Sequence, residues 1–337
     1  MKRICIVGVG AVGGFIGTLL AARGCHVSAV ARGETLKALQ LHGLRVQMGG
    51  QLLTGPVTAT LDPEELGVQD LVIVAVKAQS MNSVAAVISP LIGPETIVFS
   101  AMNGVPWWFF NGYGGSCSGL HLKAVDPGGT IAASIPDKNI IGGVVHGSFA
   151  LDEPGFVRHV GGKKLIIGEP DGTLTERVQT LATLLSEAGI EIEISTAIQQ
   201  DIWFKLWGNM TMNPVSAITG ATCDRILDDP LVKNFCLQVM TEAAEVGSKI
   251  NCPIEQSGEE RNAVTRKLGA FKTSMLNDVE AGRSVELDAL VAAVREIGEK
   301  VGVATPNMNI LLGLARLHAQ TRGLYPESRI GDEKSQS

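Results

Sequence analysis

The first seventeen residues of the chain, MKRICIVGVGAVGGFIG, place five glycines directly after a short apolar run. Residues 4–7 predict a strand, and residues 15–23 predict a helix. Between them, Gly8 permits a tight turn, Gly10 leaves room for the phosphates of a ligand, and Gly13 lets the helix pack close to the strand. Because the N-terminus of a helix attracts anions, this order of elements predicts a turn that binds the pyrophosphate of a dinucleotide.

The residues predicted to contact this cofactor are Gly8, Val9, Gly10, Ala11, Val12 and Gly13. Residues 26–30 predict the second strand of the unit. At its end, where NAD enzymes carry an Asp or Glu for the ribose hydroxyls, this chain has Ala31-Arg32-Gly33. A guanidinium there can pair with a 2′-phosphate, so Arg32 favours NADP (NADPH) over NAD. The alternative is that Arg32 is an ordinary solvated surface arginine.

Two later strands carry polar residues at their carboxyl ends. The apolar run 70–76 ends at Lys77, and the predicted strand 96–100 is followed by Asn103-Gly104. Open α/β sheets bind ligands in the crevice at this edge. Lys77 and Asn103 are therefore candidate cofactor or substrate contacts, although a strand-end lysine and a turn asparagine also explain them.

The remaining patterns complete a first domain, predicted to be α/β, of the Rossmann type, and to span residues 1–195. Helices are expected at 34–41, 80–88 and 173–188, a hairpin at 44–57 with Gly49-Gly50 in its turn, and strands at 140–145, 155–160, 164–167 and 190–194.

From residue 196 the periodicity changes to that of helices. The expected helices are 196–212, 230–250, 255–281, 287–301 and 307–322. The sequence thus predicts an all-helical second domain, residues 196–326, followed by a flexible polar tail, 327–337.

An aromatic and glycine-rich stretch, residues 107–127, stands where a short loop would suffice. It begins Trp107-Trp108-Phe109-Phe110. Next to a ligand crevice, such a segment could be a lid or a wall of the substrate pocket. It could equally pack between subunits, and exposed aromatics here favour a homodimer.

Composition and charge exclude several classes of protein. The net charge of −6 gives no basic surface for nucleic acid, and no apolar run approaches the ~18 residues that span a membrane. The six cysteines form no C-x-x-C pair and the six histidines no H-E-x-x-H motif, so we expect no metal site and reduced thiols in the cytoplasm. Glycines interrupt the N-terminal apolar run, which argues against a signal peptide.

A second group of polar residues recurs every four positions in the predicted helix 196–212 and just beyond it. Asp201, Lys205, Asn209 and Asn213 share one face, surrounded by aromatic and aliphatic residues. Desolvation would lower the pKa of Lys205, and a nearby carboxylate would oppose that shift. Such a lysine can act as a general acid, whereas a solvated helix face is the alternative.

Five segments together resemble the ketopantoate reductase (2-dehydropantoate 2-reductase) family, in the same order and over nearly the whole chain. They are GVGAVG, VAVKAQ, the Asn103-Gly104 loop, KLWGNMTMNPVSAITG and KTSMLNDVEAGRSVELDAL. The resemblance implies a Rossmann domain followed by a helical domain, and reduction of 2-dehydropantoate to (R)-pantoate with NADPH, a step toward pantothenate.

The resemblance also implies roles for individual residues. Lys205 matches the general acid and Glu286 an active-site glutamate, which makes them the catalytic candidates. The substrate-binding candidates are Asn209, Asn213, Ser274 and Asn103, and the cofactor-binding candidates include Arg32, Lys77 and again Asn103.

The insertion at 107–127 departs from the family pattern, so substrate identity stays open. One alternative is a reductase or dehydrogenase of the same family that acts on a different 2-keto or 2-hydroxy acid. The other is a non-catalytic NADP-binding sensor, which would have no use for a proton donor such as Lys205.

Overall fold

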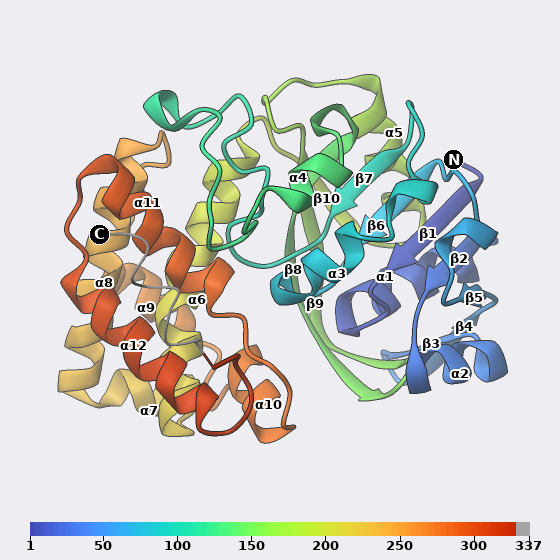
Figure 1. The fold of residues 1–337 in the computed structure, drawn as a ribbon. Coiled ribbons are helices and arrows are strands. Elements are labelled where there is room, and N and C mark those ends of the chain that lie inside the picture. The colour runs from blue at the N-terminus through green and yellow to red at the C-terminus, as the bar shows by residue number, and fades with distance from the viewer. Residues whose placement is uncertain (328–337) are drawn as a thin grey trace. The chain divides into compact units, whose positions relative to one another are not determined.

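The computed structural model describes residues 1–327 and divides the chain into two compact units (Figure 1). The first unit is Met1–Trp203, and the second begins at Phe204. Except for Glu327, the predicted tail 327–337 lies outside the described residues.

The first unit is built on one mixed β-sheet with helices packed on it. Its strands are β1 (Arg3–Val7), β2 (His26–Val30), β3 (Leu44–Met48), β4 (Gln51–Gly55), β5 (Thr58–Thr60), β6 (Leu71–Val74), β7 (Ile97–Ser100), β8 (Ile140–Glu153), β9 (Phe156–Gly168) and β10 (Glu191–Ile194). Its α-helices are α1 (Ala11–Ala22), α2 (Gly33–His42), α3 (Met81–Ala85), α4 (Thr130–Ser134) and α5 (Glu176–Glu187).

Six strands of this sheet are parallel and lie in the order β5-β2-β1-β6-β7-β8. In chain order within this set, that arrangement is 3-2-1-4-5-6, the order of the doubly wound dinucleotide-binding fold. The predicted Rossmann-type architecture is therefore confirmed. The order reverses between β1 and β6, so the crevice that such sheets use for ligands opens beyond these two strands.

The other side of the sheet is a hairpin extension that the sequence patterns described incompletely. β8 and β9 pair antiparallel along their length, through β-bulges near Ser148, and Figure 1 shows them as two long green strands. β9 then pairs with β3, and β3 pairs with β4 in the predicted hairpin. The expected separate strands 155–160 and 164–167 are one strand, because β9 continues across Gly161 and Gly162 against its partner.

Helix α1 is buried along most of its length, from Gly13 to Ala21. It packs against β1 and also against β3, β4 and β9. The helix begins at Ala11 and not at residue 15, because its first turn is built from the glycine-rich sequence itself. Two further differences are β5, which no pattern indicated, and α3, which is shorter than the expected helix 80–88.

The aromatic start of the 107–127 segment is buried in the core of the first unit. Trp108 and Phe109 are 0% exposed, and Phe109 lies 6.0 Å from Trp203, centroid to centroid. Gly142 of β8 provides the space for the Trp108 ring, which a side chain at that position would fill. The expectation of exposed aromatics was therefore wrong. Because these side chains are buried, they no longer favour a homodimer.

The second unit is helical in the part of the chain that the structure describes. Its elements are the later turns of α6 (Ile198–Thr219), then α7 (Cys223–Asp228), α8 (Pro230–Lys249), α9 (Gly258–Arg266), α10 (Ser274–Glu280), the π-helical turn η6 (Asp288–Ala292), α11 (Ala293–Val301) and α12 (Pro306–Gln320).

Two expected helix boundaries in this unit were wrong. The predicted helix 255–281 is two helices, because Gly269 adopts φ +64° after α9 and Thr273 caps α10 by accepting a hydrogen bond from the Leu276 N–H. In contrast, α6 continues past Pro214 to Thr219. Burial of Ser216 and its neighbours stabilises these last turns despite the missing proline N–H.

The division between the units falls inside α6 and not at residue 195. The first turns of this helix belong to the core of the first unit: Ile198 packs against Gly142 and Gly168, and Trp203 lies beside Phe109. Across residues 1–327, no helix combines the length and apolarity needed to cross a membrane.

Candidate functional site

The glycine-rich turn after β1 has three glycines with three different surroundings. Gly8 has φ +97°, and a Cβ there would come within 2.6 Å of Val76 Cγ1. A Cβ on Gly13 would overlap the carbonyl oxygen of Gly8 and touch Ile6 Cγ2. Apart from its neighbours in the chain, no heavy atom lies within 4 Å of the Cβ position of Gly10. The turn is thus tightly packed underneath and open at Gly10.

The N-terminus of α1 carries no side chain that satisfies its backbone N–H groups. Gly10 is the N-cap, and the first turn contains no acidic residue. Unpaired N–H groups and the helix dipole attract a phosphate, and the open space at Gly10 gives it access. The residues present therefore fit the pyrophosphate of a dinucleotide.

The other predicted cofactor residues follow parallel strands at the same edge of the sheet. The Ala75 N–H donates to Val7 O and the Ala101 N–H to Val74 O, each at 2.9 Å. The chain that leads to Lys77 is thereby fixed beside β1, and the chain that leads to Asn103 beside β6. Both side chains are half-buried.

Arg32 lies directly beyond β2, at the N-cap of α2, and is exposed. The neighbouring Ala31 N–H donates to Thr60 O of β5 at 2.9 Å, which fixes the backbone at this point. The structure therefore places Arg32 at the same edge of the sheet as the glycine-rich turn.

In the second unit, α6 carries the predicted proton donor. Lys205 is half-buried, and the periodicity of α6 puts Asn209 and Asn213 on the same face. Burial lowers the pKa of Lys205 to about 8, and the carboxylate of Glu286 opposes this shift. The structure thus brings Lys205 and Glu286 into electrostatic contact, although the two are far apart in the sequence.

Asp201, the first member of the polar stripe, has a separate role. Its carboxylate accepts a hydrogen bond from Ser195 Oγ at 2.5 Å, and Ser195 Oγ in turn accepts from the Ala197 N–H. Burial raises the pKa of Asp201. Asp201 therefore fixes the start of α6, and the carboxylate that acts on Lys205 is Glu286.

The next turn of α6 is held by specific contacts within the second unit. The indole N–H of Trp207 donates to Met240 O of α8 at 2.7 Å. The guanidinium of Arg261 lies over the ring of Phe204, 5.8 Å from its centroid, and against Gly208, where a Cβ would be 2.7 Å from Arg261 Nη2. Gly208 is thus a packing residue, and these contacts fix the helix segment that carries Lys205 and Asn209.

Ser274 is the first residue of α10 and is exposed. The hydroxyl that caps this helix belongs to its neighbour Thr273, so Ser274 is not used in the cap. Its substrate-binding role stays a prediction, as do the roles of Asn209 and Asn213. Among residues 1–327, no group of three or more His, Cys, Asp or Glu side chains could hold a metal ion.

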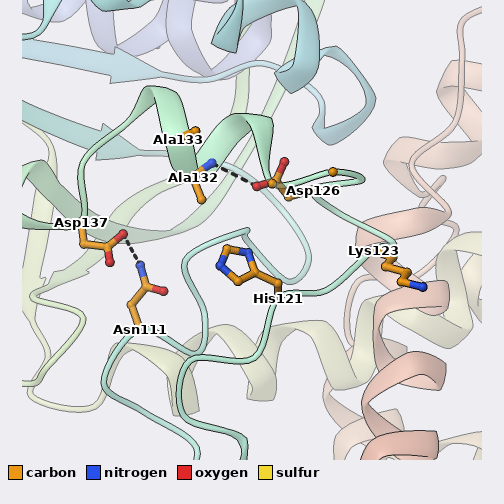
Figure 2. Close-up of a pocket in the computed structure, with 9 residues that line it drawn as sticks. Asn111, His121, Lys123, Asp126, Ala132, Ala133 and Asp137 are labelled. Carbon is orange, nitrogen blue, oxygen red and sulfur yellow. Dashed lines mark hydrogen bonds between the residues drawn. The ribbon is translucent and has the colours of Figure 1, made fainter.

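A separate open pocket of about 730 Å³ lies in the connection between β7 and β8 (Figure 2). Asn111 donates to Asp137 on one side of it, at 2.6 Å. Asp126 accepts the Ile131 and Ala132 N–H groups and so holds the start of α4. None of the predicted site residues lines this pocket. Its lining residues are Asn111, His121, Lys123, Asp126, Gly128, Gly129, Ala132, Ala133 and Asp137.

The doubly wound sheet, with its glycine-rich first turn and helical second unit, defines the architecture of nucleotide-dependent oxidoreductases. Comparison with known proteins agrees. The family described as Ketopantoate reductase PanE/ApbA matches residues 4–107, and the description Ketopantoate reductase PanE/ApbA C terminal matches residues 197–319. The chain belongs to this family of oxidoreductases.

Individual relatives match along almost their whole length. A 2-dehydropantoate 2-reductase of Mesorhizobium japonicum is 42% identical over 324 residues, which are 96% of this chain and 99% of that protein. A crystal structure from Ralstonia solanacearum MolK2, described as a candidate ketopantoate reductase, is 59% identical with a TM-score of 0.92 and covers 96% of this chain and 100% of that one. The 2-dehydropantoate 2-reductase of Geobacter metallireducens GS-15 is 26% identical with a TM-score of 0.81, covering 94% and 99%.

The packing of the first turn predicts effects of very different size for two alanine substitutions. Gly13→Ala should destabilise the fold by about 3 kcal/mol or more, because the new methyl group meets backbone. Gly10→Ala, the matched control, should change the free energy of unfolding by less than about 1 kcal/mol, because its methyl group meets open space. Urea denaturation followed by circular dichroism measures both. Equal stability of the two variants would contradict the close packing of Gly13 against Gly8.

Proposed function

We propose that the protein is a 2-dehydropantoate 2-reductase that uses NADPH to reduce the ketone of 2-dehydropantoate and forms (R)-pantoate, on the way to pantothenate. The observation that carries the proposal is the pair Lys205 and Glu286, in which a half-buried lysine has its pKa lowered to about 8 beside a carboxylate. The full-length similarity to a protein named 2-dehydropantoate 2-reductase supports the substrate.

When bound, NADPH supplies the hydride. As the carbonyl carbon is reduced, the electron pair of the C=O bond moves to the oxygen, which becomes negatively charged. Lys205 Nζ–H⁺ stabilises this charge and donates its proton to the oxygen. The product is then an alcohol and the lysine a neutral amine, which recovers its proton from water. A donor with a pKa of about 8 is mostly protonated at neutral pH and still releases its proton easily.

Glu286 acts on the donor and not on the ketone in this scheme. Its negative charge stabilises the protonated form of Lys205 against desolvation. The amide side chains of Asn209, Asn213 and Asn103 and the hydroxyl of Ser274 are assigned to the substrate, since they can bind its hydroxyl and carboxylate groups.

The cofactor assignment rests on the glycine-rich turn and on the residues that follow the two strands beside β1, which are β2 and β6. The turn and the start of α1 fit the pyrophosphate, and Lys77 directly follows Val76, which lies against Gly8 of the turn. Arg32 is exposed directly after β2, at the position where an Asp or Glu would repel a 2′-phosphate, and the nearby Glu34 is paired with Lys37. We therefore assign the 2′-phosphate of NADPH to Arg32.

A panel of 2-keto acids tests the substrate. Purified protein with NADPH should reduce 2-dehydropantoate with the highest kcat/KM of the panel, measured as loss of absorbance of the nicotinamide. A higher kcat/KM for a bulkier keto acid would reassign the substrate within the family. Binding of NADPH with no reduction of any keto acid would favour a sensor and contradict the proposal.

The pKa of Lys205 predicts the pH dependence. A general acid must be protonated, so kcat/KM should be constant at lower pH and fall about tenfold per pH unit above about 8. Lys205→Ala should lose about 10²–10⁴-fold in kcat and keep its affinity for NADPH. Lys233→Ala, at a partly exposed ion pair of α8, is the control and should retain normal activity. A wild-type profile that stays flat well above pH 8 would refute the acid role.

The role of Arg32 predicts a change in cofactor preference. Arg32→Ala should weaken NADPH binding by roughly 10- to 100-fold, because a charge-assisted hydrogen bond contributes about 1.5–3 kcal/mol, and should leave NADH binding nearly unchanged. Arg23→Ala, at the other end of α1, is the matched control. Fluorescence titration measures both affinities, and an equal loss for NADPH and NADH would show that Arg32 does not bind the 2′-phosphate.

A further inference from the structure

The segment that carries Glu286 has no regular secondary structure between α10 and η6. Its neighbours Val285 and Leu287 are 3% and 1% exposed, whereas Glu286 itself is half-buried. The two apolar anchors fix the backbone on either side of the carboxylate. Burial of these two side chains does not by itself explain the conformation of the backbone at Glu286.

The chain after α12 returns to this segment. Gly323, with φ +66°, turns the chain, and the Leu324 N–H donates to Ala319 O at 2.9 Å. Gln320 Nε2 then donates to Pro326 O at 2.9 Å. The stretch from residue 321 to 326 is thus fastened to the end of α12.

Two hydrogen bonds join this stretch to the Glu286 segment, one on each side of Glu286. On one side, the Val285 N–H donates to Leu324 O at 3.1 Å. On the other, Tyr325 OH donates to Asp288 Oδ1 at 2.5 Å. We call this pair of contacts, made by Leu324 and Tyr325, the C-terminal clamp.

Asp288 is also the first residue of the π-helical turn η6. Both the Val291 and the Ala292 N–H groups donate to Leu287 O, at 2.8 and 3.1 Å, which widens the helix immediately after Glu286. Such turns occur often at functional sites. The Tyr325 hydroxyl therefore fixes the residue at which the irregular backbone begins.

Charged groups of α12 and of the residues around α10 act near this segment. Arg316 of α12 acts on both Asp288 and Tyr325, and Arg283 pairs with Asp278 at 2.9 Å. Burial raises the pKa of Asp288, and the hydrogen bond from Tyr325 opposes that shift. Glu286 is the group of the second unit whose charge acts on Lys205.

We propose that Tyr325 and Asp288 are positioning residues, which hold Glu286 at the place from which its charge acts on Lys205. The interaction between two charges falls with their separation, so a half-exposed carboxylate on a loosely held segment would affect the lysine less. The clamp restricts that segment from both sides. The inference rests on the proposed roles of Lys205 and Glu286.

The titration of Lys205 tests the clamp without any catalytic step. Trace acetylation of the whole protein with acetic anhydride, between about pH 6 and pH 10, gives the pKa of Lys205 from the mass-spectrometric yield of its peptide. Glu286→Gln should move the midpoint down by about one pH unit or more. Tyr325→Phe should move it in the same direction by roughly half as much, because it weakens the same interaction.

Two further variants separate positioning from other effects. Asp288→Asn can still accept the Tyr325 hydrogen bond, so the midpoint of Lys205 in this variant should stay close to that of wild type. A fall of the midpoint as large as in Tyr325→Phe would mean that the charge of Asp288 acts on Lys205 directly. That result would overturn the clamp. Glu242→Gln weakens the buried cap of α12, where Glu242 accepts the Asn307 and Met308 N–H groups, and controls for general destabilisation of the unit.

The kcat/KM profile of each variant completes the test. If Tyr325→Phe moves both the labelling midpoint and the alkaline limb of kcat/KM to lower pH, the clamp and the acid role are both supported. If only labelling moves, the clamp stands and Lys205 is not the proton donor. An unchanged labelling midpoint in Tyr325→Phe, or an equal change in Glu242→Gln, overturns the clamp.

Discussion

The close packing of α1 is the constraint on which the first unit depends. Strands approach this helix from two sides: Gly13 and Gly17 lie against Ile6 of β1, and Gly14 lies against Val157 of β9. At the far end, Gly55 of β4 leaves room for Ala21. Side chains at these positions would separate the layers and expose apolar surface. Because the helix is held from both sides, its N-terminus and the turn at Gly8 are fixed before any ligand arrives.

This packing explains which parts of the fold could be predicted from the sequence. The spacing of Gly8, Gly10 and Gly13 is a local pattern, and it correctly indicated the turn and the sheet around it. Gly14 and Gly17 report contacts with β9 and β3, which lie far along the chain. A period of two or 3.6 residues cannot show such contacts. The hairpin extension of β8 and β9 was therefore the part of the sheet predicted least well.

In the candidate site, too, local spacing predicted some features and distant contacts determined the others. The four-residue spacing from Asp201 to Asn213 correctly suggested a shared helix face, but not which carboxylate serves Lys205. Ser195 binds Asp201, and Glu286 arrives from another element. Only the family resemblance singled out Glu286. The aromatic run at Trp107 misled because composition does not distinguish a buried cluster from an exposed one.

Helix α6 belongs to both units, and this has a consequence for dissecting the protein. Its first turns bury Ile198 and Trp203, while later turns bury Leu206, Trp207 and Met210. A cut between residues 203 and 204 would leave the first fragment with only the first turns of this helix and the second with the rest, and each cut end would expose apolar side chains. Neither fragment is expected to be a well-behaved soluble domain. The chain is therefore one polypeptide with two cores, and a continuous helix, α6, takes the place of a linker between them.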